Sequence, residues 1–319
     1  EHIDVLIIGA GISGVGAGYH LKANSPGKSF AILEGRETMG GTWDLFKYPG
    51  IRSDSDMYTL GYSFRPWTDP KAIADGPSIL KYVKDTAREH GIDKHIRFSH
   101  KVISADWSTP DALWHIKAER GPTKEPVSFT ANFLFMCGGY YNHDEAFTPE
   151  FEGREDLKGQ VIHPQFWPED MDYTGKKVVV IGSGATAMTL VPSMTDKAEH
   201  VTMLQRTPTY VVSRPGTDAF ANFMRKYLPS KLAYGITRWK NVLMGMYFYR
   251  MCMKQPAKVK DYLLGMVREE LGDEEVKKHF TPTYKPWDQR VCLVPDSDLY
   301  EALKSGKASA VTDHIDRFT

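Results

Sequence analysis

The sequence has few cysteines, and their distribution excludes two classes of protein. Only three of the 319 residues are cysteine, and Cys137, Cys252 and Cys292 lie far apart. An odd number of scattered cysteines without a Cys-x-x-Cys pair argues against a disulfide framework and against a dithiol redox centre. We therefore expect a reduced, cytoplasmic protein.

Long apolar runs and an excess of one charge are also missing. No apolar run reaches the ~18 residues that cross a bilayer, and the first residues do not resemble a signal peptide. Forty basic and forty acidic residues cancel, so no net field favours nucleic acid. We expect no nucleic-acid partner, no metal and no stable membrane span. The length predicts about two domains, and the abrupt ends "EHIDVLIIGAG" and "DHIDRFT" suggest part of a longer protein.

The first motif present is a glycine-rich turn after an apolar run. Residues 5–8 are typical of a buried parallel strand, and Gly9-x-Gly11-x-x-Gly14 follows before a helical segment. The first glycine makes the tight turn, the second admits a pyrophosphate, and the third allows close packing of helix and strand. The start of the helix offers free N–H groups to phosphates. This pattern predicts a dinucleotide-binding site.

A second strand ends at Glu34, 20 positions after Gly14, where a carboxylate accepts from a ribose hydroxyl. A long loop containing "GGTWDLFKYPGIRSDSDMY" and a helix over 78–90, with Ser78 as its N-cap, are expected next. "HIRFSHKVISADWS" and "ALWHIKAER" predict strands, and "FLFMCGG" predicts a buried strand. Strands inserted before the last parallel strand favour a flavin-binding variant of the dinucleotide fold.

The same device occurs again after residue 177. A strand over 178–181 leads into Gly182-x-Gly184-x-x-Ala187, a helix and the strand "HVTMLQR". Where the first motif has Glu34, this one has Gln205 and Arg206. An arginine binds a 2′-phosphate that an acidic residue would repel. The acidic site therefore suits FAD and the basic site NADPH, which restricts the protein to flavin reductases and flavin monooxygenases.

The stretch "GQVIHPQFWPED" lies between the two motifs. Pro164 and Pro168 disfavour helix at His163 and Trp167, so both rings are expected on extended chain. From these residues alone, a packed inter-domain linker is favoured over a direct chemical role.

Leu157-x-Gly159-x-x-x-His163-x-x-x-Trp167-Pro168 resembles the fingerprint F-x-G-x-x-x-H-x-x-x-W-P of type I Baeyer–Villiger monooxygenases, with leucine replacing phenylalanine. Trp167 distinguishes this pattern from related flavin-containing monooxygenases, which usually have phenylalanine or tyrosine there. The stretches "GGTWDLFKYPGIRSDSDMYTLGYSFRPW", "LQRTPTYVVS" and "YKPWDQRVCLVPDSDLYEAL" are also similar to the branch that includes the mycobacterial ethionamide-activating monooxygenase.

The resemblance implies an enzyme in which NADPH reduces FAD and O₂ adds to give a C4a-peroxyflavin. This oxidant inserts oxygen into ketones and oxidises sulfur in thioethers or thioamides. Arg290 in "WDQR" matches the active-site arginine of the family, and Asp54 in "RSD" matches the carboxylate that holds it. The fingerprint histidine is usually viewed as coordinating the domains.

The resemblance also implies the residues that contact each cofactor. Those implied for FAD are Gly9, Gly11, Ser13, Gly14, Glu34, Gly41, Thr42, Trp43, Asp54, Tyr58 and Val102. Those implied for NADPH are Gly182, Gly184, Ala185, Thr186, Ala187, Arg206 and Thr207. Gln289 stands where the family commonly has a lysine, so NADPH preference is expected to be weaker.

The expected fold is α/β, with two Rossmann-like domains and a helical insertion in the second. We expect an FAD domain over 1–150, a linker with the fingerprint over 151–174, an NADPH domain over 175–214 and 290–319, and the insertion over 215–289. The insertion mixes aromatic, methionine and basic residues in "ITRWKNVLMGMYFYRMCMKQ". Core packing is the favoured use of these side chains; a pocket lining and peripheral association with a membrane stay open.

Two alternatives to the leading hypothesis also stay open. One is a flavin-containing monooxygenase that oxidises nitrogen or sulfur. The other is a non-catalytic nucleotide-binding fragment. The expected partners are a small ketone or sulfur compound and O₂.

Overall fold

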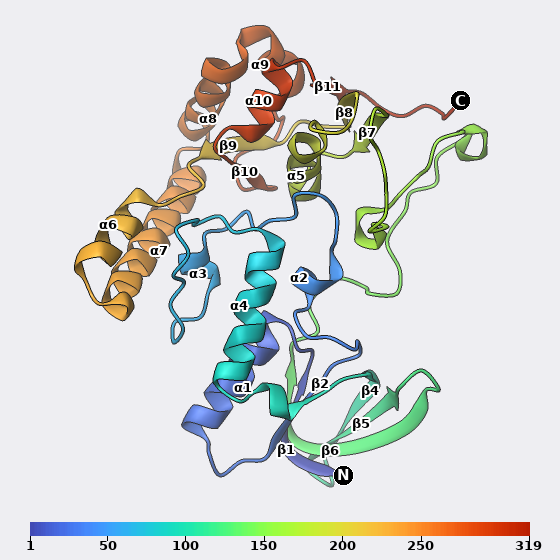
Figure 1. The fold of residues 1–319 in the computed structure, drawn as a ribbon, viewed down its shortest axis with the longest axis vertical. Helices are drawn as coiled ribbons and strands as arrows, with labels where there is room; N and C mark the ends of the chain where they lie inside the picture. Colours follow the sequence, from blue (N-terminus) through green and yellow to red (C-terminus); the bar gives the residue numbers. More distant parts are fainter. The chain divides into compact units, whose positions relative to one another are not determined.

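The computed structural model describes residues 1–319 and divides into two compact units. The first comprises Glu1–Phe46 and Gly76–Ala146, and the second comprises Lys47–Asp75 and Phe147–Thr319. Figure 1 shows the elements of both. Each unit has parallel strands and contains a strand, a glycine-rich loop and a helix in succession, which confirms the predicted α/β class with two Rossmann-like domains.

The first unit has a sheet of six strands in the order β3-β2-β1-β6-β5-β4. Its elements in chain order are β1 (His2–Ile8), α1 (Ile12–Asn24), β2 (Phe30–Leu33), α2 (Thr42–Leu45), α4 (Gly76–Glu89), β3 (Ile96–Arg97), β4 (His100–Ser108), β5 (Leu113–Arg120) and β6 (Glu125–Met136). β3, β2, β1 and β6 run parallel, while β5 and β4 extend the sheet as an antiparallel pair. The predicted insertion of strands before the last parallel strand is confirmed.

The core of this unit forms where apolar residues of neighbouring strands meet on one face. Ile3 and Leu6 of β1 pack with Leu33 of β2 and with Ile116 and Phe129 of β5 and β6. On the other side, α1 packs against β1, β2 and α4. The packed strands hold β1 in place, so the loop that follows Ile8 has a fixed start.

Two local predictions in this unit are wrong. Helix α4 begins at Gly76, so Ser78 lies inside the first turn and is not the N-cap. Pro77 is tolerated there because N–H groups of a first turn have no partner within the helix. The end of β6 is not buried: Phe133 is 56% and Met136 67% exposed, because the helices of this unit pack against other strands.

The second unit contains two small parallel sheets, β11-β8-β7 and β10-β9. Its elements in chain order are α3 (Met57–Leu60), β7 (Lys177–Ile181), α5 (Ala185–Met194), β8 (His200–Gln205), β9 (Tyr210–Arg214), α6 (Ala219–Tyr227), α7 (Ser230–Lys254), α8 (Pro256–Leu271), α9 (Asp273–His279), β10 (Val291–Pro295), α10 (Asp298–Lys304) and β11 (Ala308–Thr312). In the sequence, helices α6 to α9 come between β9 and β10, and these two strands pair with each other. This arrangement agrees with a helical insertion. No helix has both the length and the apolar character required to cross a membrane.

The segment 47–75 differs from the proposed domain boundaries, because it packs within the second unit. Ala72 and Ile73 donate backbone hydrogen bonds to the carbonyl of Gly216, and α3 packs against α7. Arg238 of α7 donates to the carbonyls of Tyr58 and Gly61, both at 2.7 Å. The chain therefore passes between the units three times, at residues 46–47, 75–76 and 146–147.

Candidate cofactor-binding sites

The first glycine-rich loop joins β1 to α1 in the first unit. The Gly9 N–H donates to the Leu33 carbonyl at 2.8 Å, which fixes the turn against β2. A Cβ on Gly14 would lie 1.9 Å from the carbonyl oxygen of Gly9, so only glycine fits at that position. Gly11 is the N-cap of α1, which leaves the first turn without a side-chain cap. Ser13 is exposed on this turn.

Glu34 braces this loop from the end of β2. Its Oε2 accepts the N–H of Ala10 at 2.8 Å, and its Oε1 accepts the N–H of Arg36 at 3.0 Å. The side chain is 6% exposed, and each carboxylate oxygen keeps a further lone pair. The predicted contact with a ribose hydroxyl must use one of these.

A second loop packs on the first through its backbone. The Gly40 N–H donates to the Ala10 carbonyl at 3.0 Å. Gly41 lies so near Gly11 that a Cβ on it would be 3.1 Å from the Gly11 Cα. Helix α2 starts directly afterwards, and it carries two of the predicted FAD contacts, Thr42 and Trp43. Val102 is different: its side chain lies on β4 and packs against the sheet core.

An ion cluster near this loop was not predicted. Arg36 pairs with the buried Asp44 at 2.7 Å, and Lys84 of α4 approaches the same carboxylate at 3.5 Å. The Nη1 atom of Arg36 is buried and has no hydrogen-bond partner. A buried donor without an acceptor is costly, so this nitrogen is available to a bound anion. The sequence gives one indication of this role for Arg36, which is its position two residues after Glu34.

The second glycine-rich loop repeats the geometry of the first. The Gly182 N–H donates to the Leu204 carbonyl at 2.7 Å, and α5 starts directly after Gly184. The third small residue is Ala187, which is 4% exposed in α5. The hydroxyl of Ser183 hydrogen-bonds to the Thr207 carbonyl at 3.2 Å and to Thr209 Oγ1 at 3.0 Å, which holds the loop beside the end of β8.

The hydrogen bonds from Gly9 to Leu33 and from Gly182 to Leu204 are equivalent. The next residues, Glu34 and Gln205, therefore occupy equivalent positions in the two units. Gln205 Nε2 donates to the His279 carbonyl at 2.6 Å and to Thr312 Oγ1 at 3.0 Å. It is 1% exposed, so it stabilises the end of β8 and is closed to a ligand. Arg206 is exposed and forms no hydrogen bond or ion pair. Thr207 is also exposed.

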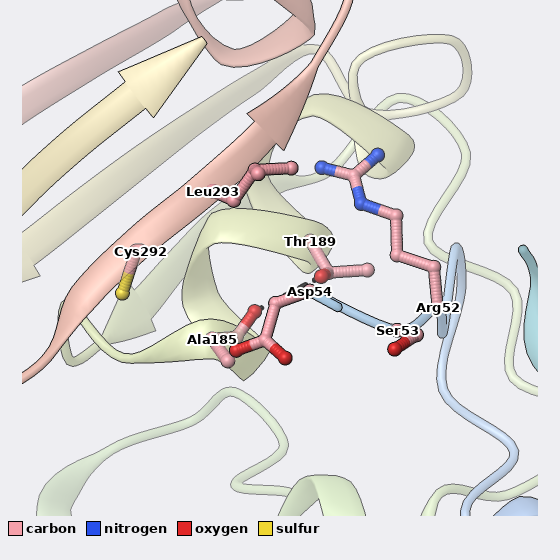
Figure 2. A pocket seen from close by; sticks show the side chains of 7 residues that line it. All are labelled: Arg52, Ser53, Asp54, Ala185, Thr189, Cys292 and Leu293. Atoms are coloured by element: carbon pink, nitrogen blue, oxygen red, sulfur yellow. Dashed lines mark hydrogen bonds between the residues drawn. The ribbon is translucent and has the colours of Figure 1, made fainter. Parts of the chain in front are cut away.

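The start of α5 is contacted by residues from the segment 47–75. Tyr48 hydrogen-bonds to Thr186, and burial raises the pKa of the tyrosine. A small cavity of about 10 Å³ lies here, room for about one water molecule. Figure 2 shows its lining: Arg52, Ser53, Asp54, Ala185, Thr189, Cys292 and Leu293. Asp54 is thus placed beside α5 and β10.

Asp54 and Arg290 form no ion pair in this structure, although a direct pair was expected. Arg290 lies instead over the second glycine loop, where a Cβ on Gly184 would be 2.6 Å from its Nη1. Both side chains are exposed, and ion pairs in water gain little free energy. The charges of Arg290 and Asp54 nevertheless both shift the pKa of the Cys292 thiol. Burial raises the pKa of Cys292 to about 11, with Arg290 lowering it and Asp54 raising it by smaller amounts.

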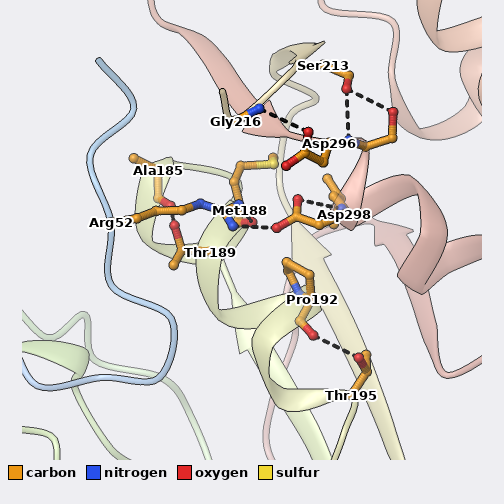
Figure 3. Close-up of polar contacts among 12 residues, drawn as sticks. Arg52, Ala185, Met188, Thr189, Pro192, Thr195, Ser213, Gly216, Asp296 and Asp298 are labelled. Carbon is orange, nitrogen blue, oxygen red and sulfur yellow. Dashed lines mark hydrogen bonds and ion pairs between the residues drawn. The ribbon is translucent and has the colours of Figure 1, made fainter. Parts of the chain in front are cut away.

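A second unpredicted ion pair holds the segment that carries Asp54. Arg52 pairs with Asp298 at the start of α10, and its Nη2 donates to the Met188 carbonyl at 3.4 Å. Figure 3 shows this contact beside α5. The two residues are separated by 246 positions, so no local sequence pattern could predict this ion pair. The pair connects a loop, α5 and α10.

Tyr58 is placed as a packing residue. It is 1% exposed, and its ring centroid lies 5.9 Å from that of Tyr234 on α7. Its hydroxyl is buried without a partner, so only this group is available for the predicted contact with FAD.

The fingerprint residues form a turn in the second unit. His163 and Trp167 both have extended backbone, as expected, and a single 3-10 turn over Pro164–Phe166 separates them. His163 Nδ1 accepts the N–H of Gln165 at 3.2 Å, and burial lowers the pKa of the imidazole. The Trp167 ring lies edge-on to Tyr173. Gly159 and Pro168 are exposed.

Two family models match the chain. The flavin-binding monooxygenase-like model matches residues 59–264, and a model of an NAD(P)-binding Rossmann-like domain matches residues 7–72. The first match covers more than half of the 319 residues. The chain therefore belongs to the flavin-binding monooxygenase-like family.

Curated relatives match along the whole chain. It is 57% identical to the FAD-containing monooxygenase EthA of Mycobacterium tuberculosis over 321 residues, which is 65% of that protein. It is 50% identical over 320 residues to the probable FAD-binding monooxygenase AlmA of Acinetobacter baylyi, which is 64% of that protein. The chain thus spans about two-thirds of the length of these relatives.

Solved structures share the fold. An oxidized steroid monooxygenase bound to NADP matches with a TM-score of 0.78 at 24% identity, over 98% of this chain and 66% of that one. An ε-caprolactone-bound cyclohexanone monooxygenase matches with a TM-score of 0.79 at 21% identity, over 98% of this chain and 67% of that one. At these identities the likeness shows the fold alone.

Proposed function

We propose that this chain holds FAD on its first glycine loop and NADPH on its second, as the nucleotide-binding part of a flavin monooxygenase. The observation that carries the proposal is the difference in charge at the ends of two matching loops. The first ends at a buried carboxylate, Glu34, whereas the second has the neutral Gln205 at the equivalent position, followed by the exposed, unpaired guanidinium of Arg206. EthA and AlmA, whose names identify FAD monooxygenases, match this chain from end to end.

The residues of the first loop fit FAD. Gly14 packs the start of α1 closely against the loop, and Gly11, which has no side chain, leaves the uncapped N–H groups of that helix start accessible to a pyrophosphate. The orphaned Nη1 of Arg36 supplies a buried donor. FAD contacts by Gly9, Ser13, Gly41, Thr42, Trp43, Asp54, Tyr58 and Val102 belong to the same proposal.

The second loop fits NADPH. Arg206 is free to form a forked, charge-assisted contact with a 2′-phosphate, and the Thr207 hydroxyl is exposed beside it. Gln205 removes the negative charge that would repel this phosphate, because it is neutral and turned inward. Gly182, Gly184, Ala185, Thr186 and Ala187 would hold the pyrophosphate at the start of α5.

Bound FAD would supply the redox chemistry, taking hydride from NADPH and passing electrons to O₂. Arg290 is proposed to stabilise the negative charge that develops on the substrate oxygen, because a guanidinium stays charged at every working pH. Asp54 would balance this cation, and the Arg52–Asp298 pair holds the segment that carries Asp54. Gly159, His163, Trp167 and Pro168 are proposed to shape the linker and to take no part in proton transfer.

We propose ketones and organic sulfur compounds as substrates of the complete protein. Trp167 at the end of the fingerprint supports the Baeyer–Villiger class over general flavin-containing monooxygenases. The test uses the complete, flavin-loaded protein with cyclohexanone, a thioether and an amine under isotopically labelled O₂. Labelled lactone or sulfoxide formed with consumption of NADPH is the expected result. Oxidation of the amine alone would favour the general class, and unlabelled products would contradict oxygen insertion.

A further inference from the structure

One segment of the insertion differs in charge from the rest of the chain. Residues 219–260 contain nine of the forty basic residues and none of the forty acidic residues. The rest of the chain therefore has a net negative formal charge, while this segment is strongly basic. It comprises α6, α7 and the start of α8.

Most of this charge is not used in ion pairs. Lys240 pairs with Asp218, and three other basic residues donate to backbone carbonyls. The remaining five are exposed and have no acidic partner: Lys226, Lys231, Arg250, Lys254 and Lys258. The segment thus presents positive charge to whatever lies against it.

Helix α7 also carries an exposed apolar stripe. Its members recur at intervals of three, four or one residues and so share one side of the helix. The stripe consists of Leu232, Ile236, Trp239, Leu243, Met246 and Tyr247, and Trp239 and Tyr247 are 65% and 67% exposed. The opposite side, with Tyr234, Thr237 and Cys252, is buried. Packing therefore explains the apolar residues on one side only.

Helix α6 adds aromatic residues next to this stripe. Phe220, Phe223 and Tyr227 share one face of α6 and are 40%, 60% and 63% exposed. Lys240 of α7 pairs with Asp218 and lies 4.6 Å from the centroid of the Phe220 ring. The aromatic face of α6 therefore begins beside α7, and the two helices lie side by side in Figure 1.

The combination of these features fits one kind of partner. Tryptophan and tyrosine favour the boundary between water and lipid, and apolar side chains below them enter the acyl layer. Lysine and arginine beside such a stripe extend to anionic headgroups while their stems stay in apolar surroundings. An acidic protein would also attract the charge. The bilayer is favoured because the unpaired cations are spread from residue 226 to residue 258 along one long helix and its neighbours.

We propose that α6 and α7 bind flat on an anionic phospholipid membrane, with the α7 stripe at the headgroup boundary. The binding is peripheral, since the exposed side of α7 combines the apolar stripe with basic residues and the helix does not have the apolar character required to cross a membrane. The partner is a bilayer containing acidic phospholipid. This inference does not depend on which substrate the protein oxidises.

The test is sedimentation of the complete, flavin-loaded protein with vesicles. We expect binding to phosphatidylcholine vesicles with about 30% phosphatidylglycerol, weak binding to pure phosphatidylcholine, and release in about 1 M salt. Lys231→Gln, Arg250→Gln and Lys254→Gln together should weaken binding by about 100-fold, since each basic residue contributes about fivefold. The matched control replaces three exposed, unpaired lysines elsewhere, Lys94, Lys117 and Lys307, and should change binding little.

The depth of the stripe is tested by fluorescence. Brominated phosphatidylcholine in the anionic vesicles should quench tryptophan emission of the wild type, and Trp239→Phe should remove most of that quenching while the protein still sediments. The proposal is overturned if the wild type does not bind anionic vesicles, or if the control triple variant loses as much binding as the α7 variant. It is also overturned if the stripe instead mediates self-association, seen as oligomers that dissociate in a Trp239→Ser, Leu243→Ser variant without any vesicle binding.

Discussion

The two glycine loops have the same backbone design but different supports. In each, the first glycine donates to a carbonyl of the neighbouring strand, at 2.8 Å from Gly9 and 2.7 Å from Gly182. In the first unit a carboxylate then braces the loop, whereas in the second the corresponding Gln205 faces the insertion. The common hydrogen bond therefore sets the turn, while the residues that follow it, Glu34 in the first loop and Gln205 and Arg206 in the second, decide which charge a ligand meets.

The largest expected effect comes from the third small residue. Gly14→Ala places a methyl group against the Gly9 carbonyl and should destabilise the first unit by about 3 kcal/mol, with loss of FAD. Ala187→Gly, the reciprocal change in α5, should cost only about 1 kcal/mol. Denaturant unfolding and flavin absorbance measure both. Normal FAD retention in Gly14→Ala would mean that the loop has more freedom than the structure shows.

Arg290→Ala should separate the two half-reactions. We expect flavin reduction by NADPH to continue, while oxygenated product falls by about 100-fold or more, because a preorganised cation is lost. Stopped-flow reduction and product analysis measure each step. Equal loss of both would contradict the assigned role and would suggest that Arg290 instead supports the loop at Gly184.

Arg206→Ala should raise KM for NADPH by about 10-fold or more and change KM for NADH little, because a charged hydrogen bond contributes roughly 1.5–3 kcal/mol. Glu34→Gln in the first unit is the matched variant, and it should leave the NADPH-to-NADH ratio unchanged. A ratio that Arg206→Ala does not alter would remove the distinction between the loops.

Arg52→Ala should lower the free energy of unfolding by about 1 kcal/mol, since its ion pair with Asp298 is only partly buried. Lys28→Ala removes a more exposed pair with Asp4 in the first unit and should have a smaller effect. Urea denaturation compares the two. A larger loss for Lys28→Ala would reverse the expected order.

The smallest effect concerns two thiols near the loops. Burial raises the pKa of Cys292 to about 11 and also raises that of Cys137, which is only half-buried. The Cys292 thiolate is therefore about 0.1% of the total at pH 8. Thiol labelling of the native protein at that pH, located by mass spectrometry, should modify Cys137 and spare Cys292. Preferential labelling of Cys292 would show that its pocket opens.

Local patterns predicted the loops well because their requirements are local. A buried strand, a tight turn and a helix start are each determined by adjacent residues, and the residue after the second strand is found by counting. The predicted N-cap at Ser78 failed because a proline is accepted in the first turn. The exposure of the end of β6 could not be predicted from its apolar residues, since it depends on what packs against Phe133 and Met136.

Contacts between distant segments were outside the reach of spacing rules. Arg52 and Asp298 are separated by 246 residues, and Arg36, Asp44 and Lys84 meet only once α2 and α4 are folded. The family resemblance matched Asp54 and Arg290 as a pair, and the structure places both near Cys292 without joining them. The catalytic role of Arg290 stays a prediction that Arg290→Ala tests, and that of Asp54 stays a prediction.

The three chain crossings have a practical consequence for dissecting the molecule. Neither unit is a continuous piece of the gene, because residues 47–75 are inserted in one and packed in the other. A polypeptide starting at residue 147 would leave α5 without Tyr48 and α10 without Arg52, and would strip α7 of α3. A usable second unit would instead require residues 47–75 to be supplied as a separate peptide or fused through a new linker.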